Sequence, residues 1–347
     1  MKWRPCGTFN VSYKQELSII RLRFHWIVFI AFLAFIFLLP QFIPPSLLDF
    51  LIRTTIILII ILGLQLLMGY CGQISLGHAA FACVGAFTGA ILLKYGVPYL
   101  VGLAFAGIAA GLTGLLFGLP AVRIKGLYLA ISTLAAHFMV MFVIVHFAGG
   151  ASGYAVPPPK VLGFQFTSDV HVYYLVLSVL IILTYGAKNL TRSKAGRAFV
   201  AVRDHEIAAH TLGVNIFSYK LLAFIVSCFY AGVGGFLWVT YLQWASVEHF
   251  PLWQAVWYVG IIVVGGLGRI EGAFLGTLFF EGLNDLCSVM APAISQVFPA
   301  FGGTVIAALP ILAFSILLIV FIIFEPRGMA HRWRLMLASF RLYPFNY

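Results

Sequence analysis

Apolar residues are arranged along this chain in runs long enough to cross a membrane. Ten hydrophobic segments can be drawn, at residues 26–43, 50–68, 74–93, 97–118, 126–147, 171–186, 219–241, 252–267, 272–290 and 301–324. Runs of about 20 apolar residues match an α-helix that spans roughly 30 Å of hydrocarbon. Transmembrane barrels instead show short strands of alternating residues. The pattern therefore predicts an all-α integral membrane protein with about ten transmembrane helices.

One long polar segment, residues 188–220, interrupts this pattern and holds six of the 21 basic residues. Within it, helical spacing relates Phe199, Val202, Glu206, Ala209 and Gly213. This spacing predicts a short amphipathic helix between Gly196 and Leu212. Such a helix between two transmembrane segments can act as a rigid docking element that a partner protein binds. The alternative is a solvated loop that only keeps its flanking helices in the cytoplasm.

The distribution of basic residues predicts the orientation of the chain. All but three of the 21 Lys and Arg residues lie in the terminal segments and in every second connection; the exceptions are Arg53, Lys94 and Lys160. Cytoplasmic connections are enriched in Lys and Arg, so both termini are expected inside. An odd number of spans would spoil this partition. The first apolar run is followed by Pro40, Gln41 and Phe42 rather than by a small-residue cleavage site, which predicts an uncleaved first helix.

Composition supports the membrane interpretation and excludes several others. The chain is 62% hydrophobic and only 9% charged, with a mean hydropathy of +1.04, whereas soluble chains carry about a quarter charged residues. The net charge of +11 is therefore interpreted as a topology and lipid-surface signal, and no nucleic-acid partner is expected. The five cysteines are scattered, which indicates neither a disulfide framework nor a zinc site.

Two segments differ from plain membrane anchors because they are rich in glycine. These are residues 69–93 and 265–285, and Gly72-Gln73-Ile74 in the first resembles Gly268-Arg269-Ile270 in the second. One interpretation is a parallel internal repeat with broken helices near the centre of a transport path. Glycines at four-residue spacing also allow close helix–helix contact, as at Gly85 and Gly89 or Gly272 and Gly276. Tight packing alone is the simpler alternative.

Polar residues inside the hydrophobic segments are the candidates for a translocation path. The first group is Gln73, Ser75, Gly77 and His78, and the second is Glu281 and Asp285. Polar groups within membrane segments are costly and often functional, although a histidine among small residues is commonly structural. The two acids are spaced i, i+4 and share a helix face if the ninth segment remains helical that far. The alternative places the helix end near Phe280 and both acids in solvent outside.

Motifs of known catalytic and nucleotide sites are not matched. His205-Glu206 and His210 are one residue too widely spaced for the zinc motif HExxH, and Gly266, Gly268 and Gly272 do not fit GxGxxG. The chain contains no GxxxxGK[ST], the loop that cradles ATP phosphates. We therefore expect no catalytic residues, no metal ligands and no cofactor on this chain. Any energy for pumping must come from a partner or from an ion gradient.

Five groups of residues, in order along the chain, resemble one known family. They are Gly72–His78 with Phe81 and Gly85; Arg123, Gly126, Leu127, Tyr128 and Thr133; Ser193, Gly196, Arg197, Ala201, Arg203, Glu206, Ala209, Leu212, Gly213, Lys220, Ala223 and Phe224; Gly265, Gly266, Gly268, Gly272 and Gly276; and Glu325–Met329. Together they resemble LivM-type permease subunits of the branched-chain amino-acid ABC importer family. The resemblance covers residues from about 51 to 330.

The resemblance implies a function for the polar segment. It implies a single transmembrane permease domain over residues 1–347, with a cytoplasmic N-terminal segment (1–25), a coupling loop (187–218) and a cytoplasmic tail (325–347). Residues 196–213 would form a coupling helix seated in an ATP-binding subunit. The residues expected to couple are Gly196, Arg197, Arg203, Glu206, Ala208, Ala209 and Gly213. Expected partners are a second, related permease, two ATP-binding subunits that carry ATP and Mg²⁺, an extracytoplasmic binding protein and the lipids of a bacterial inner membrane.

Two further alternatives remain open at this point. The same machine could import urea or short amides, since a path supplied by a binding protein need not show the chemistry of its cargo. A stand-alone, gradient-driven transporter or channel could instead use His78, Glu281 and Asp285 as a proton relay. Departures from the family pattern, such as Ala273 after Gly272 and the long apolar stretch 286–303, bear on the cargo more than on the family.

Overall fold

The computed structural model describes residues 23–122, 124, 126–149, 152–161, 163–166, 168–297 and 302–342. Its longer helices are α2 (Arg23–Leu38), α3 (Pro45–Leu64), α4 (His78–Lys94), α5 (Tyr99–Ala121), α6 (Leu127–Phe147), α7 (Asp169–Arg192), α8 (Lys194–Asp204), α10 (Ile216–Leu242), α11 (Leu252–Gly265), α12 (Ile270–Val297), α13 (Gly302–Phe324) and α14 (Met329–Leu342). Shorter helical segments are η1 (Leu39–Gln41), η2 (Gln65–Tyr70), α9 (Glu206–Thr211) and η3 (Val247–His249). Most of the predicted N-terminal segment, 1–25, lies outside the described residues.

Each of the ten predicted hydrophobic segments coincides with a helix, which confirms the all-α class. Six described helices are long and apolar enough to cross a membrane, and a pair bent by 50° near the C-terminal end gives a seventh if it is one span. Helix α4 has 17 residues and falls just short of that length. Helix α12 continues to Val297, so most of the long apolar stretch 286–303 noted in the sequence is helical. The number of ten spans stays a prediction.

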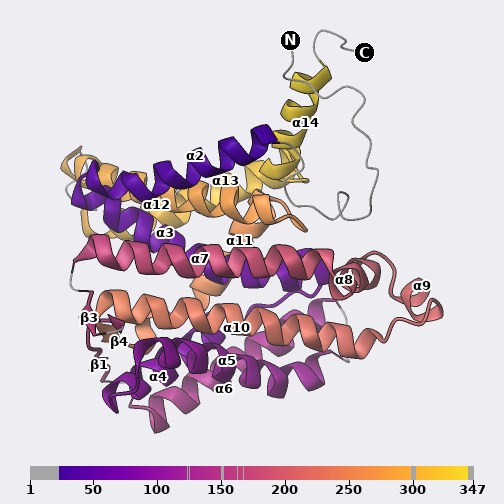
Figure 1. The fold of residues 1–347 in the computed structure, drawn as a ribbon, viewed down its shortest axis with the longest axis horizontal. Helices are drawn as coiled ribbons and strands as arrows, with labels where there is room; N and C mark the ends of the chain where they lie inside the picture. Colours follow the sequence, from indigo (N-terminus) through magenta and orange to yellow (C-terminus); the bar gives the residue numbers. More distant parts are fainter. Residues whose placement is uncertain are drawn as a thin grey trace.

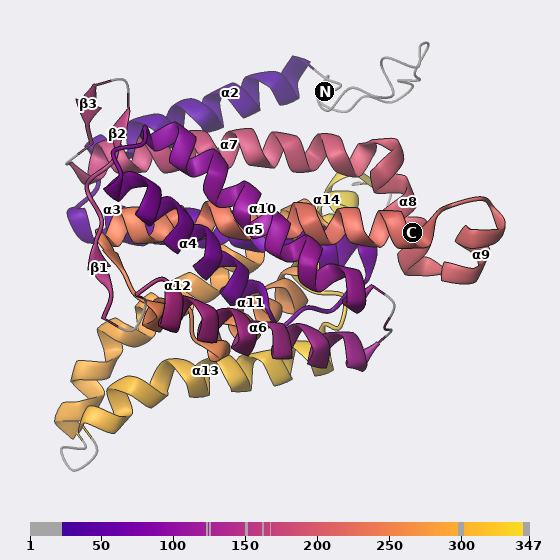
Figure 2. The same ribbon diagram turned by 90° about the horizontal axis from the view of Figure 1, so that it is seen from below.

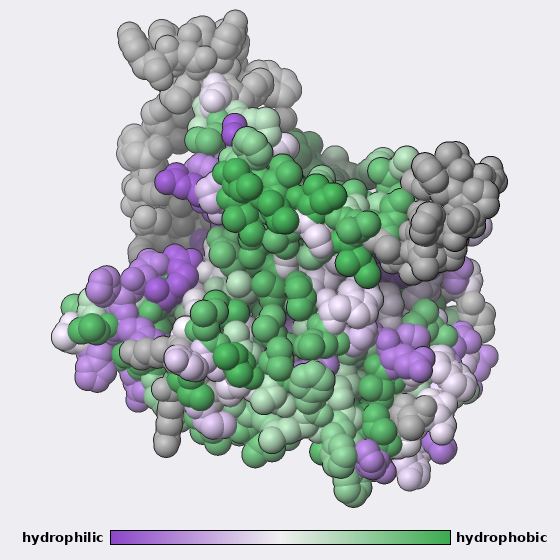
Figure 3. All heavy atoms as spheres, turned by 180° about the vertical axis from the view of Figure 1, so that it is seen from behind, coloured by the Kyte–Doolittle hydropathy of each residue, from purple (hydrophilic) through white to green (hydrophobic). Residues whose placement is uncertain are grey.

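The long helices run side by side and define two ends of the bundle (Figure 1). Helices α8 and α9 lie at one end, which we call the α8–α9 end, and short strands lie at the other, which we call the strand end (Figures 1 and 2). Strand β1 (Tyr154–Ala155) pairs antiparallel with β4 (Trp244–Ala245), and β2 (Lys160–Val161) with β3 (Phe164–Gln165). Apolar surface covers much of the bundle between polar groups at its two ends (Figure 3), as a helix bundle in lipid requires.

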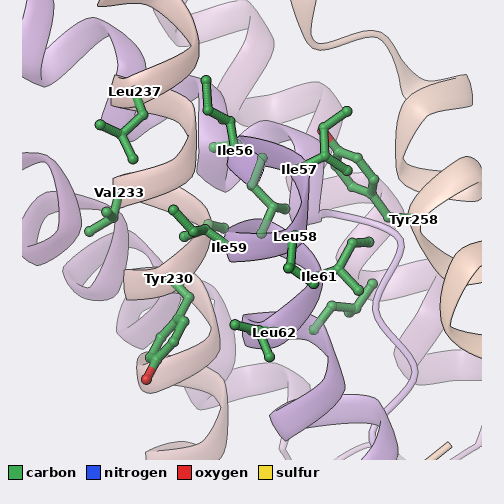
Figure 4. Packing of buried hydrophobic residues seen from close by; sticks show 14 of the residues in the cluster. Ile56, Ile57, Leu58, Ile59, Ile61, Leu62, Tyr230, Val233, Leu237 and Tyr258 are labelled. Atoms are coloured by element: carbon green, nitrogen blue, oxygen red, sulfur yellow. The ribbon is translucent and has the colours of Figure 1, made fainter. Parts of the chain in front are cut away.

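Helix α10 is the centre of the packing and contacts α3, α4 and α5 most extensively. On the α3 side, isoleucines such as Ile56 and Ile59 face Val233 and Leu237 of α10 (Figure 4). On the α4 side, glycines let two backbones meet. A Cβ atom at Gly235 would lie 1.9 Å from the carbonyl oxygen of Ala82. The close contact predicted for Gly85 is confirmed at this interface, since a Cβ atom there would lie 2.3 Å from Cα of Gly232 on α10.

Replacing Gly235 with Ala is expected to lower the melting temperature of the protein in detergent. The added methyl group would overlap the backbone of α4, and overpacking of this kind costs about 1–3 kcal/mol. Gly282→Ala on α12 is the matched control, because a Cβ built there meets no described atom within 4 Å beyond its chain neighbours and its own helix backbone. Its melting temperature should stay equal or rise slightly, since Ala favours helix. Equal melting temperatures for the two variants would contradict the close contact.

The breaks in the two glycine-rich segments lie before their helices rather than within them. Helix α3 passes into the π-helical segment η2, and a non-helical stretch from Gly72 to Gly77 then precedes α4. In the second segment, Gly266 and Gly268 separate α11 from α12. Gly72 and Gly268 have similar positive φ values of 73° and 76°, a conformation that favours glycine. Each of the two glycine-rich segments thus contains a break, as the sequence suggested, while the internal repeat stays a prediction.

Candidate functional site

The predicted amphipathic helix in the polar segment is two helices rather than one. Helix α8 ends at Asp204, His205 is extended with φ −158° and ψ 97°, and α9 begins at Glu206. The prediction of one helix from Gly196 to Leu212 was therefore wrong at His205. Helical spacing persisted across the break because α9 resumes at once, so the sequence pattern alone did not show it.

Helix α8 begins with a capped first turn that only glycine can complete. The hydroxyl of Ser193 accepts a hydrogen bond from the backbone N–H of Gly196 at 3.4 Å, as an N-cap residue does. A Cβ atom at Gly196 would lie 2.3 Å from the carbonyl oxygen of Thr191. The apolar side of α8, with Phe199 and Val202, is buried. The capped first turn and the buried apolar side together fix the position of α8 on the bundle.

Helix α9 forms the outermost tip of this end (Figures 1 and 2). Ala209 is buried, whereas Ile207 and Leu212 are 74% and 83% exposed. Gly213 ends the helix with φ 83°, and the following N–H of Val214 donates to the carbonyl oxygen of Ala209 at 3.0 Å. A positive-φ glycine that closes a helix in this way is a common C-terminal cap. The tip therefore presents apolar side chains on a defined backbone.

The other residues expected to couple divide between surface and interior. Arg197 is exposed, and its Nη1 donates to the carbonyl oxygen of Arg192 at 3.1 Å. Ala208 is exposed on α9. Glu206, at the first turn of α9, forms an ion pair with Lys220 of α10, and the Lys220 side chain is only 8% exposed. The structure thus turns Glu206 inward and leaves Arg197 and Ala208 on the surface.

Arg203 of α8 has a side chain that is 34% exposed, and it contacts both glycine-rich breaks. Its Nη1 donates to the carbonyl oxygen of Gly69 at 2.8 Å. A Cβ atom at Gly72 would lie 2.8 Å from Cγ of Arg203, and one at Gly268 would lie 2.6 Å from Nη1. The arginine therefore fits between the two breaks only because both positions are glycine. We call the cluster Gly69, Gly72, Gly266 and Gly268 the glycine junction.

Gln65 joins the two halves of the glycine junction from the other side. Its Nε2 donates to the carbonyl oxygens of Gly266 at 3.0 Å and Arg269 at 2.8 Å. Arg269 in turn donates from Nη1 to the carbonyl oxygen of Ala330 on α14 at 3.1 Å. The glycine junction thus brings together elements that are far apart in sequence: η2, α8, the α11–α12 break and α14. The predicted likeness of the two glycine motifs is accompanied by direct contact between them.

A cavity of about 660 Å³ lies beside this arrangement at the α8–α9 end. Glu206 and His210 of α9, Gly213 and Lys220 are among the residues that line it. A second ion pair, Lys188 Nζ to Glu271 Oε1 at 3.1 Å, ties the end of α7 to the start of α12. The polar side chains at this end therefore connect the α8–α9 segment to several helices of the bundle.

The residues of the first predicted path group are buried between helices of the bundle. His78 and Ser75 are fully buried. Nε2 of His78 and Oγ of Ser227 on α10 are 2.7 Å apart, Ser227 donates to the carbonyl oxygen of Gly63 at 2.6 Å, and Nδ1 of His78 is 3.5 Å from Oγ of Ser75. Because the serine hydroxyl has one proton, this arrangement makes Nε2 of His78 the donor to Ser227. His78 therefore links α4 to α10 and α3.

Gly77 and Gln73 complete this group in different ways. A Cβ atom at Gly77 would lie 2.7 Å from the carbonyl oxygen of Thr133, so the turn packs on α6. Gln73 is 2% exposed, and neither its Oε1 nor its Nε2 has a hydrogen-bond partner among the residues that the structure describes. A buried amide left without partners is unfavourable. Gln73 is thus the member of the group with unsatisfied polar atoms.

The second path group lies on one continuous helix toward the strand end. Helix α12 extends past both Glu281 and Asp285, so the alternative of a helix ending near Phe280 was wrong. Glu281 is buried and accepts a hydrogen bond from Nε1 of Trp257 at 3.3 Å. Asp285 lies 3.8 Å from Arg53, which also pairs with Asp49 at 2.6 Å. Both acids therefore have partners within this chain.

Comparison with known proteins shows the family of the chain. The family described as branched-chain amino acid transport system / permease component matches residues 46–324. The chain belongs to this permease family. It is thus a multi-pass membrane protein of the LivM type, in agreement with the apolar helices and the five motif groups.

Individual relatives support the assignment. The permeases named LivM of the high-affinity branched-chain amino acid transport systems of Escherichia coli K12 and Salmonella typhimurium LT2 are each 30% identical over 275 residues, covering 71% of this chain and 65% of theirs. The match thus spans about two thirds of the length of these relatives. An autoinducer 2 import system permease, LsrC, of Enterobacter sp. 638 is 27% identical over 252 residues, covering 71% of this chain and 70% of its own.

Several residues of the permease's α8–α9 end were missed by sequence reasoning. Gln65 stands alone in an apolar run, and this isolation was a signal that it would seek a polar partner. Lys220 was counted as a basic residue of the loop and as part of the family pattern but was given no partner, although its position inside the next apolar segment indicated burial. Ser227, Lys188 and Glu271 gave no comparable signal, because their partners come from distant parts of the chain.

Proposed function

We propose that this permease is the transmembrane subunit of an ATP-driven ABC importer and forms half of a pathway for branched-chain or other hydrophobic amino acids. The observation that carries the proposal is the α9 tip, which projects from one end of a LivM-type bundle with exposed Ile207 and Leu212. Two exposed apolar side chains on one protruding turn can enter the apolar core of an interface with a protein partner. ATP and Mg²⁺ belong to that partner in this proposal.

The assembly proposed around this chain follows from its orientation. The α8–α9 end faces the cytoplasm of a bacterial inner membrane, both termini lie inside, and the α9 tip seats in an ATP-binding subunit. A second, related permease completes the pathway, and an extracytoplasmic binding protein delivers cargo at the strand end. The asymmetry of Lys and Arg along the chain supports this orientation.

The path groups also enter the proposal. Gln73 supports a role for the first group, because its unpaired buried amide would gain a partner if water or cargo reached it. Ser75, Gly77 and His78 are proposed to shape that stretch through packing, in view of their contacts. Glu281 and Asp285 are proposed to line the half of the path toward the strand end. In this conformation their partners Trp257 and Arg53 hold them.

The cargo is tested by uptake through the complex purified from native membranes and reconstituted with its binding protein. We expect ATP-dependent accumulation of labelled leucine, and no accumulation of labelled urea. Uptake of urea without leucine would replace the amino-acid assignment with the urea or short-amide alternative. The relatives named for autoinducer 2 import make a third labelled cargo of that class a useful addition. A complex stripped of its ATP-binding subunits should accumulate nothing under an ion gradient.

A further inference from the structure

We propose that Arg203 is a positioning residue that holds the glycine junction closed and makes its opening depend on the position of α8. The proposal rests on the proposed function, since ATP-binding subunits are what would move α8. Arg203 was expected to belong to the surface that docks a partner. Its side chain is 34% exposed, and its guanidinium also donates to Gly69 and contacts two breaks between helices.

The first argument is the geometry of the guanidinium. Asp204 fixes its orientation, because Nε and Nη2 of Arg203 lie 2.9 and 2.8 Å from Oδ1 of the aspartate. This pairing occupies the solvent side and leaves Nη1 free to donate to Gly69. The Gly69 carbonyl belongs to the last turn of η2, where helix carbonyls lack intrahelical partners and the helix dipole is negative. A cationic donor at that point stabilises the end of η2.

The second argument is that one side chain controls both halves of the junction. Arg203 packs against Gly72 with its aliphatic stem and against Gly268 with Nη1. Gly69 and Gly268 also meet directly, since a Cβ atom at Gly69 would lie 2.6 Å from the backbone nitrogen of Gly268. Neither break can therefore shift toward the position of Arg203 while the arginine stays. Withdrawal of α8 removes the hydrogen bond and the steric block together.

The third argument is that the closed junction carries an unfavourable feature that opening would relieve. Gln73 lies next to Gly72, is 2% exposed, and has both amide atoms without partners among the described residues. Hydration of this amide favours an open state, whereas the Arg203–Gly69 bond favours the closed one. Two opposed contributions of this kind would let the position of α8 shift the junction between a closed and an open arrangement.

Cys71 provides a native reporter for the state of the junction. It lies between Tyr70 and Gly72 and is only 2% exposed. The reporter protein keeps Cys71 and replaces the other four cysteines, Cys6, Cys83, Cys228 and Cys287, with Ala. The complete complex in lipid nanodiscs is treated with a water-soluble maleimide, with and without a non-hydrolysable ATP analogue. The measured quantity is the rate of labelling at Cys71.

We expect Arg203→Gln to raise the nucleotide-free labelling rate by about tenfold or more, because loss of a hydrogen bond from a charged donor shifts an opening equilibrium by that amount. Labelling should then no longer depend on the ATP analogue, and transport per ATP hydrolysed should fall. Arg203→Lys should restore part of the protection, since an ammonium can still donate to Gly69. The matched control is Lys194→Gln, which removes an exposed cation from the same helix and should label as the reporter protein does.

The outcomes separate this inference from the proposed function. If the reporter protein responds to nucleotide and Arg203→Gln labels and responds in the same way, Arg203 does not hold the junction and the inference is overturned while the importer function stands. If Arg203→Gln labels faster but the reporter protein ignores nucleotide, transmission from α8 to the junction is overturned, and ATP-dependent uptake by the same complex decides separately whether the importer function stands. Recovery of the ATP-binding subunits with each variant verifies that assembly is intact in either case.

Discussion

Leu212→Asp is expected to abolish co-purification of the permease with its ATP-binding subunits and, with it, ATP-dependent uptake. The Leu212 side chain is 83% exposed at the α9 tip, and seating it in a partner would bury most of that surface. Lost burial of a leucine together with the cost of burying a carboxylate corresponds to at least about 100-fold weaker binding. The measurement is the amount of ATP-binding subunit recovered with tagged permease from native membranes.

Phe164→Asp is the matched control for this variant. Phe164 is 77% exposed in β3 at the strand end, so the same chemical change is made on a comparably exposed residue at the opposite end of the bundle. Recovery of the ATP-binding subunits with this control should equal the wild-type level. Ile207→Asp, at the second exposed apolar position of the tip, should behave as Leu212→Asp does. Wild-type recovery with both tip variants would remove α9 from the docking surface.

Lys220→Met is expected to destabilise the α8–α9 end strongly and to reduce transport. The variant leaves Glu206, whose side chain is 21% exposed, without the cation that pairs with it from α10. Removal of one member of a largely buried ion pair costs about 2–5 kcal/mol, most of it from the carboxylate left behind. The melting temperature of the purified complex and its uptake rate are the measurements.

The double variant Lys220→Met with Glu206→Gln tests the origin of that loss. Removing both charges eliminates the uncompensated carboxylate, so most of the lost stability should return. A cycle in which the two changes are simply additive would show that the pair does not interact in the folded protein. Transport by the double variant then separates stability from coupling: restored stability with low uptake would assign the charged pair to transmission as well as to folding.

Sequence periodicity was sufficient to predict the helices because each helix that crosses a bilayer needs a long apolar segment. Each predicted apolar segment became a helix, and the glycine pairs marked where α10 and its neighbours meet closely. The break at His205 escaped because the residues on either side of it keep helical spacing. A single extended residue changes the direction of the chain without changing the period of its pattern, so hydrophobic periodicity does not detect it.

The site was only partly predictable for a related reason. The sequence indicated that the polar segment and the two glycine motifs carry the special chemistry, but not that they touch one another. Arg203 and Gly69 are 134 positions apart, and Gln65 and Gly266 are 201 apart. Neither separation leaves a local signal. The same limit applies to His78, whose partner Ser227 lies on α10.

Helix α10 runs from the α8–α9 end of the bundle to the strand end as one continuous helix. The ion pair at Lys220 lies about one turn from the start of α10, whose 27 residues, Ile216–Leu242, extend about 40 Å at the helical rise per residue. Immediately beyond it, Val156 donates to the carbonyl oxygen of Gln243 at 3.0 Å, and Trp244–Ala245 pairs with Tyr154–Ala155. If α10 tilts as one unit and so couples its two ends, binding at the two ends must be reciprocal. In the proposed assembly, the extracytoplasmic binding protein would change the affinity of the permease for its ATP-binding subunits. Those subunits would change the affinity of the permease for the binding protein by the same factor.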